Sequence, residues 1–262
     1  MTKEQTGLLF LLKQYIRFCE ENNLQYWLIG GSLLGAVRHH GFIPWDDDID
    51  VMMPLEDYRK FLKLSEHLPE GLKLLTEDTK KDYPFYFCEL CNPEIPFPTG
   101  NRKGPPGIYL DIFPLVPSKK YSFFIAFLFR IICVIGFVLQ VKCGWNEFIP
   151  YKKIYARVAY NIFNLLPVYV LKKIRKILVI FISKSKQSSY CFSPGGSHKE
   201  DREFFYTKWF SKHAKMKFED IEVYVPRGWN ECLKQLYGDY WILPPKRERV
   251  SHHRKLQQWE EP

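Results

Sequence analysis

The sequence has 262 residues, carries a formal net charge of +9 and is 46% hydrophobic. This composition excludes a disordered chain, because enough apolar side chains are present to bury a core. The length fits one large domain or one domain with an insertion. The seven cysteines form no disulfide framework and we expect no secretory signal, so the sequence predicts free thiols in a reducing, cytoplasmic compartment.

The positive charge is concentrated in one central segment. Residues 112–199 contain fourteen Lys and Arg and a single acid, Glu147, a surplus of +13 that leaves −4 for the rest of the chain. The same segment is the most hydrophobic part of the sequence. A segment that is both basic and apolar is typical of proteins that lie on a membrane surface, and it argues against a nucleic-acid partner.

The N-terminal residues predict an amphipathic helix over 1–23. Apolar side chains recur there at the three- and four-residue spacing of one helix face. That face consists of Leu8, Leu11, Leu12, Tyr15 and Cys19.

A glycine pair then separates a strand from a helix. Residues 24–31 read as a buried strand that ends at the two glycines, and residues 32–41 read as a short helix. In this interpretation Ser32 is the N-cap of the helix and Gly41 ends it.

The following elements alternate between strands and helices. We expect strands at 48–53, 72–76, 86–91 and 107–113, and a helix at 54–68 that begins at Pro54. This order predicts an α+β (α/β) fold with a mixed sheet flanked by helices.

The central segment predicts two further helices. Residues 122–141 form an apolar run, broken by Arg130, that is long enough to cross a membrane. We expect this helix to lie on the membrane or dip into it, because a single crossing would separate the two halves of the fold; a buried core helix is the alternative. Residues 168–182 predict a basic amphipathic helix. Its apolar face is Val170, Leu171, Ile174, Ile177, Leu178 and Phe181, and Lys172, Lys173, Arg175 and Lys176 point away from that face.

The C-terminal part returns to a globular pattern. Residues 218–226 resemble a strand, and a helix follows that ends at Gly238. We therefore divide the chain into a catalytic core at 1–118, a hydrophobic and basic helical insertion at 119–190, and a C-terminal part at 191–262 that packs back on the core. The face of the last helix is Trp229, Cys232, Leu233, Leu236 and Tyr237.

Aspartates suggest a metal site. On a strand, Asp48 and Asp50 point to the same face, and two carboxylates on one face are suitable ligands for a hard ion such as Mg²⁺. Asp46 and Asp47 fit the turn before the strand, where water or a base such as Arg38 can compensate them. Asp111 is a lone acid in a second apolar strand and is a candidate third ligand.

A phosphate-binding turn lies upstream of these acids. At Gly30 and Gly31 the missing side chains allow backbone N–H groups to approach a phosphate, and Ser32 opens the following helix. Arg38, about two turns into that helix, is a further candidate phosphate ligand. This turn, the paired aspartates and a distant third acid together indicate metal-dependent phosphoryl transfer.

Other metal sites fit the sequence less well. An EF-hand loop that began at Asp46 would have glycine at its sixth position and glutamate at its twelfth. The sequence has Val51 and Asp57 there, so it does not fit a calcium loop. A zinc site at Cys88 and Cys91 would need two side chains that point to opposite faces of one strand. A nucleotide-sugar glycosyltransferase, which also uses a D-x-D motif, stays open, whereas His252-His253 fits a solvated basic tail.

Three segments resemble the LicD family of phosphotransferases, which are relatives of the fukutin proteins. Residues 30–62 ("GGSLLGAVRHHGFIPWDDDIDVMMPLEDYRKFL") resemble the family signature, and residues 107–115 ("GIYLDIFPL") resemble its third-acid strand. Residues 218–253 are similar to its C-terminal block. The sequence departs from the family pattern at Val116, where an acid usually follows "DIFPL".

The resemblance implies a nucleotidyltransferase-like fold with Mg²⁺ or Mn²⁺ as cofactor. Asp48, Asp50 and Asp111 would be the metal carboxylates, and the turn at residues 30–32 would bind phosphate. The implied reaction transfers phosphocholine from CDP-choline to a sugar hydroxyl of a lipopolysaccharide or teichoic acid precursor and releases CMP. Ribitol phosphate or glycerol phosphate are alternative cargoes. With the basic insertion, this activity places the protein at the cytoplasmic face of the cell membrane, where lipid-linked glycan acceptors are built.

Overall fold

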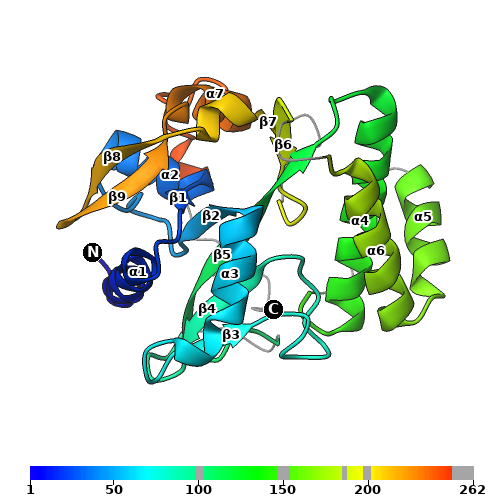
Figure 1. Cartoon of the computed structure of the whole chain (residues 1–262), viewed down its shortest axis with the longest axis horizontal. Coiled ribbons are helices and arrows are strands. Elements are labelled where there is room, and N and C mark those ends of the chain that lie inside the picture. Colours follow the sequence, from blue (N-terminus) through cyan, green and yellow to red (C-terminus); the bar gives the residue numbers. More distant parts are fainter. Residues whose placement is uncertain (98–102, 147–153, 185–187, 197–201, 250–262) are drawn as a thin grey trace.

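The computed structural model describes residues 1–97, 103–146, 154–184, 188–196 and 202–249 (Figure 1). The helices are α1 (Lys3–Glu21), α2 (Gly30–His39), α3 (Leu55–Lys63), α4 (Phe123–Lys142), α5 (Ile154–Asn164), α6 (Val168–Ile182) and α7 (Trp229–Tyr237). The strands are β1 (Trp27–Leu28), β2 (Asp50–Pro54), β3 (Lys73–Leu75), β4 (Cys88–Asn92), β5 (Ile108–Ser118), β6 (Tyr190–Phe192), β7 (Phe204–Tyr206), β8 (His213–Phe218) and β9 (Ile221–Pro226).

One mixed sheet organises the molecule. Its strands follow the order β1-β2-β5-β4-β3, and β6 and β7 extend it from the second half of β5. Strands β2 and β5 are parallel, and the other pairs in this sheet are antiparallel. The predicted mixed sheet flanked by helices is therefore confirmed (Figure 1).

At strand β5 the sheet has a core face, covered by helices, and an open face. Leu110 and Ile112 are fully buried on the face that α1 and α3 cover. Tyr109, Asp111 and Phe113 alternate with them and are only half-buried. Because side chains of a strand point alternately to its two faces, the three side chains share the open face, and the candidate site lies there.

The predicted N-terminal helix is confirmed, and all five residues of its predicted face are buried. The glycine-pair helix differs in its ends from the prediction. Helix α2 starts at Gly30, so that Ser32 lies in its first turn and does not cap it, and His40 ends it in a left-handed conformation. Gly41 follows the helix and lies against the carboxylate of Glu219, which accepts the N–H of Phe42 (2.9 Å).

Strands β1 and β2 both differ from their predicted bounds. Strand β1 contains only Trp27 and Leu28, because the chain turns at Ile29 into α2. Strand β2 begins at Asp50, so Asp48 lies in the segment just before it. Ile49 already follows the strand path, since its carbonyl oxygen accepts a hydrogen bond from the N–H of Asp111 (2.9 Å).

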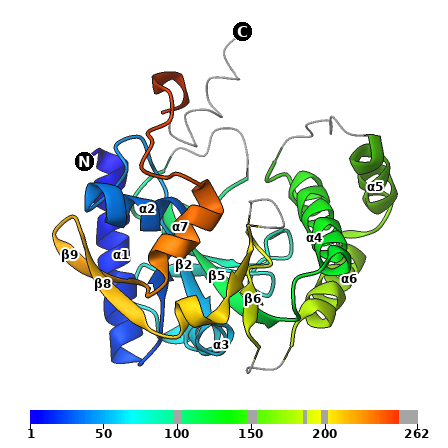
Figure 2. The ribbon, with the colours of Figure 1, turned by 90° about the horizontal axis from the view of Figure 1, so that it is seen from above.

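The insertion forms three helices beside the sheet, as Figure 2 shows from above. Both of its ends return to the same place, because the Lys119 N–H donates to Ile182 O (2.9 Å) and the Lys184 N–H donates to Pro117 O (3.0 Å). The predicted helices α4 and α6 are present, and α5 is an addition that the sequence analysis missed. Among the described residues, α4 is the one helix long and apolar enough to cross a membrane.

The orientation of α6 corrects the sequence prediction. Arg175 does not point away from the apolar face but is buried, where it pairs with Glu77 and donates to the carbonyl oxygen of Pro84 (2.5 Å). Because these two partners lie on the core, the buried face of α6 turns toward them. Ile177 and Phe181, predicted on the apolar face, are consequently exposed.

The C-terminal part packs on the sheet through a hairpin and a helix. Strands β8 and β9 form the hairpin, which contacts β1, and α7 ends at Gly238 as predicted. All seven cysteines are free thiols, and Cys88 and Cys91 lie in the buried strand β4. His252-His253 lies outside the described residues, and the three-part division of the chain stays a prediction.

Candidate active site

Three acids lie side by side across three neighbouring strands. Asp50 on β2 is in register with Asp111 on β5, and Asp111 is in register with Glu89 on β4. Residues in register on paired strands share a face of the sheet. The structure thus brings together two of the predicted metal ligands and adds Glu89, which the sequence analysis missed. The signal that singled out Asp111, an acid within an apolar strand, applies equally to Glu89.

The glycine pair lies directly against the acids. Gly30 has a positive φ of 58°, and a Cβ there would lie 2.7 Å from Oδ2 of Asp50. A Cβ on Gly31 would lie 2.8 Å from Oδ2 of Asp46. Ser32 completes the turn, because its hydroxyl oxygen accepts the N–H of Asp50 (2.9 Å). The start of α2 and the acidic segment thus lie in close contact, and the positive φ of Gly30 favours glycine at that position.

Hydrogen bonds from helix α1 hold the segment before β2. The side-chain amide of Gln5 donates to the carbonyl oxygens of Asp46 (2.9 Å) and Ile43 (3.2 Å). Burial and the neighbouring Asp48 and Asp50 raise the pKa of Asp46 to about 9. Asp46 lies in the turn before β2, as predicted, since its N–H donates to the carbonyl oxygen of Ile43 (2.9 Å), and its carboxylate is close to the other site acids.

Arg38 lies at the opposite end of α2 from the phosphate turn. Its Nη1 donates to the carbonyl oxygen of Tyr240 (2.7 Å), and burial and the nearby Arg249 lower its pKa. Eight residues of helix separate Arg38 from Gly30, which corresponds to about 12 Å. The structure assigns Arg38 a contact with the C-terminal part, and its role toward phosphate stays a prediction.

The acids raise one another's pKa. Burial raises the pKa of Asp50 well above its ordinary value, and the charges of Asp48 and Asp111 add to this effect. Burial and the charge of Glu89 do the same for Asp111. Burial also raises the pKa of Tyr237 on α7, and the charges of Asp50, Asp46 and Asp48 add to this effect. These shifts show that the carboxylates repel one another when ionised, a repulsion that a bound cation would relieve.

The donor chemistry of this site fits a hard divalent cation. Oδ1 of Asp111 and Oε2 of Glu89 are buried and have no hydrogen-bond partner. Carboxylate oxygens are the ligands that Mg²⁺ prefers. Within the described residues, no three His, Cys, Asp or Glu side chains are yet grouped closely enough to hold a metal. The site thus offers suitable oxygens on neighbouring residues, Asp50 with Asp111 and Asp111 with Glu89, without a complete set of metal ligands among the described residues.

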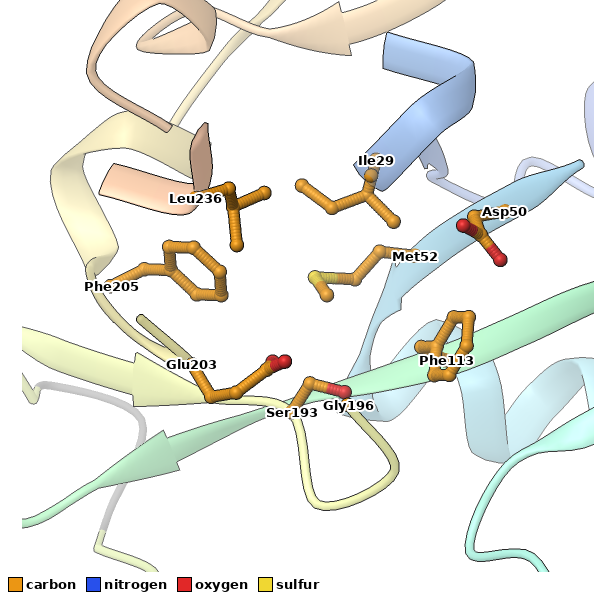
Figure 3. A pocket seen from close by; sticks show the side chains of 10 residues that line it. Ile29, Asp50, Met52, Phe113, Ser193, Gly196, Glu203, Phe205 and Leu236 are labelled. Carbon is orange, nitrogen blue, oxygen red and sulfur yellow. The ribbon is translucent and has the colours of Figure 1, made fainter. Parts of the chain in front are cut away.

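A pocket opens beside Asp50 and the glycine turn (Figure 3). Its cavity volume is only about 50 Å³, and the rings of Phe113 and Phe205 stand on opposite sides of it. The carboxylate of Glu203, a residue only 3% exposed, lies in its lower wall. The pocket is lined by Ile29, Gly30, Asp50, Met52, Phe113, Ser193, Gly196, Glu203, Phe205 and Leu236. The pocket does not follow from local sequence pattern, because its walls come from six separate stretches of the chain.

Comparison with known proteins connects this geometry to an enzyme family. A family model described as "LicD/FKTN/FKRP, nucleotidyltransferase domain" matches residues 23–127. The lipopolysaccharide cholinephosphotransferase LicD of Haemophilus influenzae is 30% identical, and the match covers 97% of this chain and 96% of that protein. The human ribitol 5-phosphate transferase FKRP is 58% identical over 38 residues, 14% of this chain and 8% of FKRP. Mannosyltransferase regulator 4 of Saccharomyces cerevisiae is 27% identical over 45% of this chain and 11% of its own length.

The glycine turn generates a first prediction. Gly30→Ala should lower the free energy of unfolding by about 1–3 kcal/mol, because alanine disfavours the positive φ and its Cβ would meet Asp50. Catalytic turnover should fall with it. Denaturant unfolding and a product assay measure the two effects. The control is Gly136→Ala on α4, where a Cβ meets nothing within 4 Å, so the change should be neutral or stabilising. Equal effects of the two substitutions would contradict the proposed turn.

The acid row generates a second prediction, on pH. Burial raises the pKa of Glu89 from its ordinary 4.5 to about 8. A folded-state pKa above the unfolded value stabilises the protein at low pH, and this contribution is lost as the pH rises through about 8. In EDTA, the free energy of unfolding should therefore fall between pH 5 and pH 9, and Glu89→Gln should reduce that fall. The exposed control Glu70→Gln should follow the wild type, and a Glu89→Gln curve parallel to the wild type would refute the prediction.

Proposed function

The chain belongs to the LicD family of transferases, and we propose that it moves phosphocholine from CDP-choline to a sugar hydroxyl, with release of CMP. The similarity to LicD of Haemophilus influenzae over 97% of the chain supports this reaction and a lipopolysaccharide precursor as acceptor. Family membership favours a phosphotransferase over the nucleotide-sugar glycosyltransferase that the D-x-D motif left open.

The pocket beside Asp50 is the observation that carries the choice of choline. A trimethylammonium group bears a positive charge but no hydrogen-bond donor, and it binds best against aromatic faces. Phe113 and Phe205 supply such faces, and the carboxylate of Glu203 adds negative charge to the wall. A polyol such as ribitol would instead leave hydroxyls without partners against this largely apolar lining, which is costly.

The arrangement of the site suggests how the donor lies. Gly30 and Asp50 border both the pocket and the row of acids, so a diphosphate at the glycine turn would have its choline in the pocket. The sugar hydroxyl then attacks the phosphorus that bears choline. Its oxygen forms the new O–P bond, the bond to the bridging oxygen of CMP breaks, and the hydroxyl proton passes to Asp111, whose Oδ1 has no hydrogen-bond partner in the protein.

A divalent cation completes this proposal. Mg²⁺ or Mn²⁺, when bound, would neutralise the diphosphate and the departing CMP. Asp48 and Asp50 are the residues that would hold it, with Asp111 as the third. Glu89 is in register with Asp111 and Asp46 lies against Gly31, so both extend the set of carboxylates that surrounds such an ion.

Ribitol phosphate is the second candidate cargo. The 58% identity to the human ribitol 5-phosphate transferase FKRP supports it, although this match spans only 38 residues. The LicD match spans nearly the whole chain and includes the segments that build the pocket. For this reason choline is the first choice and ribitol phosphate the second.

A donor screen tests the proposed reaction. With Mg²⁺ and a glycan acceptor, CMP release should be fastest with CDP-choline and slower with CDP-ribitol, CDP-glycerol and CDP-ethanolamine. Asp50→Asn and Asp111→Asn should each lower turnover roughly 10²–10³-fold, because each removes stabilisation of transition-state charge. The exposed control Asp78→Asn should retain activity. CMP release with CDP-ribitol but not with CDP-choline would make ribitol phosphate the cargo in place of phosphocholine. No CMP release from any donor would refute both.

The pocket has a separate test. Phe113→Leu keeps an apolar side chain but removes the aromatic face, so KM for CDP-choline should rise roughly 2- to 30-fold, as expected for a cation–π contact. Phe113→Tyr retains the face and should restore KM. Steady-state kinetics with CDP-glycerol provides the control, since its KM should be unchanged. An equal effect on both donors would show that the pocket does not bind the choline group.

A further inference from the structure

The helical insertion carries an exposed apolar ridge, which we define as Phe123, Phe124 and Phe127 on α4 with Ile177, Ile180 and Phe181 on α6. Phe123 is 85% exposed, and Ile180 is 63% exposed. The two helices meet at the ring contact between Phe124 and Phe181 (6.2 Å between centroids). Six large exposed apolar side chains therefore lie on the first turns of α4 and the last turns of α6, which meet at this ring contact.

The ridge is exposed although the rest of α4 is covered. Ile125, Phe129 and Ile132 pack into a cluster with residues of β6, β7 and α6. In the second half of α4, helix α5 lies over the outer face, where the rings of Phe137 and Tyr160 are 5.9 Å apart. The start of α4 thus presents phenylalanines to solvent where the same helix elsewhere buries its apolar face, and such an exposed patch indicates an interaction surface.

Positive charge surrounds the ridge. Between residues 119 and 184 the described part of the chain contains ten Lys and Arg and no acid. Lys120, Lys173, Lys176 and Lys184 are exposed close to the ridge in sequence, and the Nζ of Lys119 lies 4.0 Å above the ring of Phe181. Lysines can keep their charge at a polar boundary while their methylene chains lie along apolar surface.

The attachment of α6 to the core decides between docking and crossing. Arg175 pairs with Glu77 and donates to Pro84 O, and Lys172 donates to the carbonyl oxygen of Lys81 (3.1 Å). These contacts hold α6 against the loop before β4, and α4 packs on α6. The helix pair cannot enter a bilayer without breaking them, so only its exposed surface is available to a membrane.

We propose that the ridge docks into the interfacial layer of a membrane that contains anionic lipid. The phenylalanines and isoleucines would enter the headgroup boundary, and the lysines around them would contact lipid phosphates. Charge complementarity favours this occupant over a second copy of the chain. In a symmetric dimer each ridge would face its own equivalent, and the two sets of lysines would repel one another.

The β6–β7 hairpin places this surface next to the pocket. Phe192 and Phe204 are on the side of the hairpin that packs against α4, and Phe205 on the other side lines the pocket. In Figure 1 the hairpin stands between the start of α4 and α7. A membrane on the ridge would therefore lie close to the donor pocket, which suits an acceptor carried by a lipid; this last step rests on the proposed function, and the docking does not.

Vesicle binding by the full-length protein tests the docking. Phosphatidylcholine vesicles with phosphatidylglycerol should sediment the wild type, and vesicles of phosphatidylcholine alone should bind it less. The double variant Phe123→Ser with Phe127→Ser should lower the partition coefficient roughly tenfold or more. Lys173→Gln with Lys176→Gln should reduce the preference for phosphatidylglycerol. Circular dichroism checks that each variant is folded, and CMP release with a soluble acceptor should be unchanged.

A matched control separates the ridge from general stickiness. Phe10 on α1 is 51% exposed and Phe127 is 50% exposed, so Phe10→Ser removes the same chemistry from another surface and should leave binding intact. Binding by the ridge variant equal to that of the wild type would overturn the proposal, as would failure of the wild type to bind. A dimer that the Phe123 and Phe127 substitutions dissociate would assign the ridge to a second copy instead. Wild-type protein that binds the vesicles but releases no CMP would count against the proposed function alone.

Discussion

The crowding of carboxylates on one face of the sheet is the constraint on which the rest of the structure depends. The strand register fixes Asp50, Asp111 and Glu89 beside one another, and burial makes their charge costly. Among the described residues, those around Asp50 and Asp111 come close to these carboxylates without supplying a positive charge that would neutralise them. Gly30 and Gly31 bring backbone against the aspartates without side chains between them. A cation and a nucleotide diphosphate are the partners that such an arrangement is suited to receive.

The chain separates its two kinds of charge in space. Acids line the sheet, and the excess of Lys and Arg lies on the insertion beside it. The pair between the buried Arg175 and Glu77 joins the two parts. A reaction that uses a water-soluble nucleotide donor and a lipid-carried acceptor needs both a site for anionic phosphates and a surface for a membrane. The same short hairpin, β6–β7, borders both.

Much of the fold could be predicted from local pattern. The N-terminal helix, the strands around Cys88 and Asp111, and the last helix follow from apolar periodicity and from stop signals such as Gly238. Predictions that required a partner outside the segment were less successful. The helical pattern places Arg175 with the lysines away from the apolar face of α6, whereas in the structure it is buried and pairs with Glu77, 98 residues away in the sequence.

The sequence by itself determined which residues could bear the chemistry: the glycine pair, Asp50 and Asp111 stand out because glycines at a strand-to-helix turn and acids in apolar strands have few structural explanations. Only the tertiary structure decided which residues stand together. It added Glu89 through register and assembled the pocket around Phe113 and Phe205 from distant segments. Neighbours in a segment follow from its period, whereas neighbours across a sheet depend on how strands align, and a single segment carries no record of that alignment.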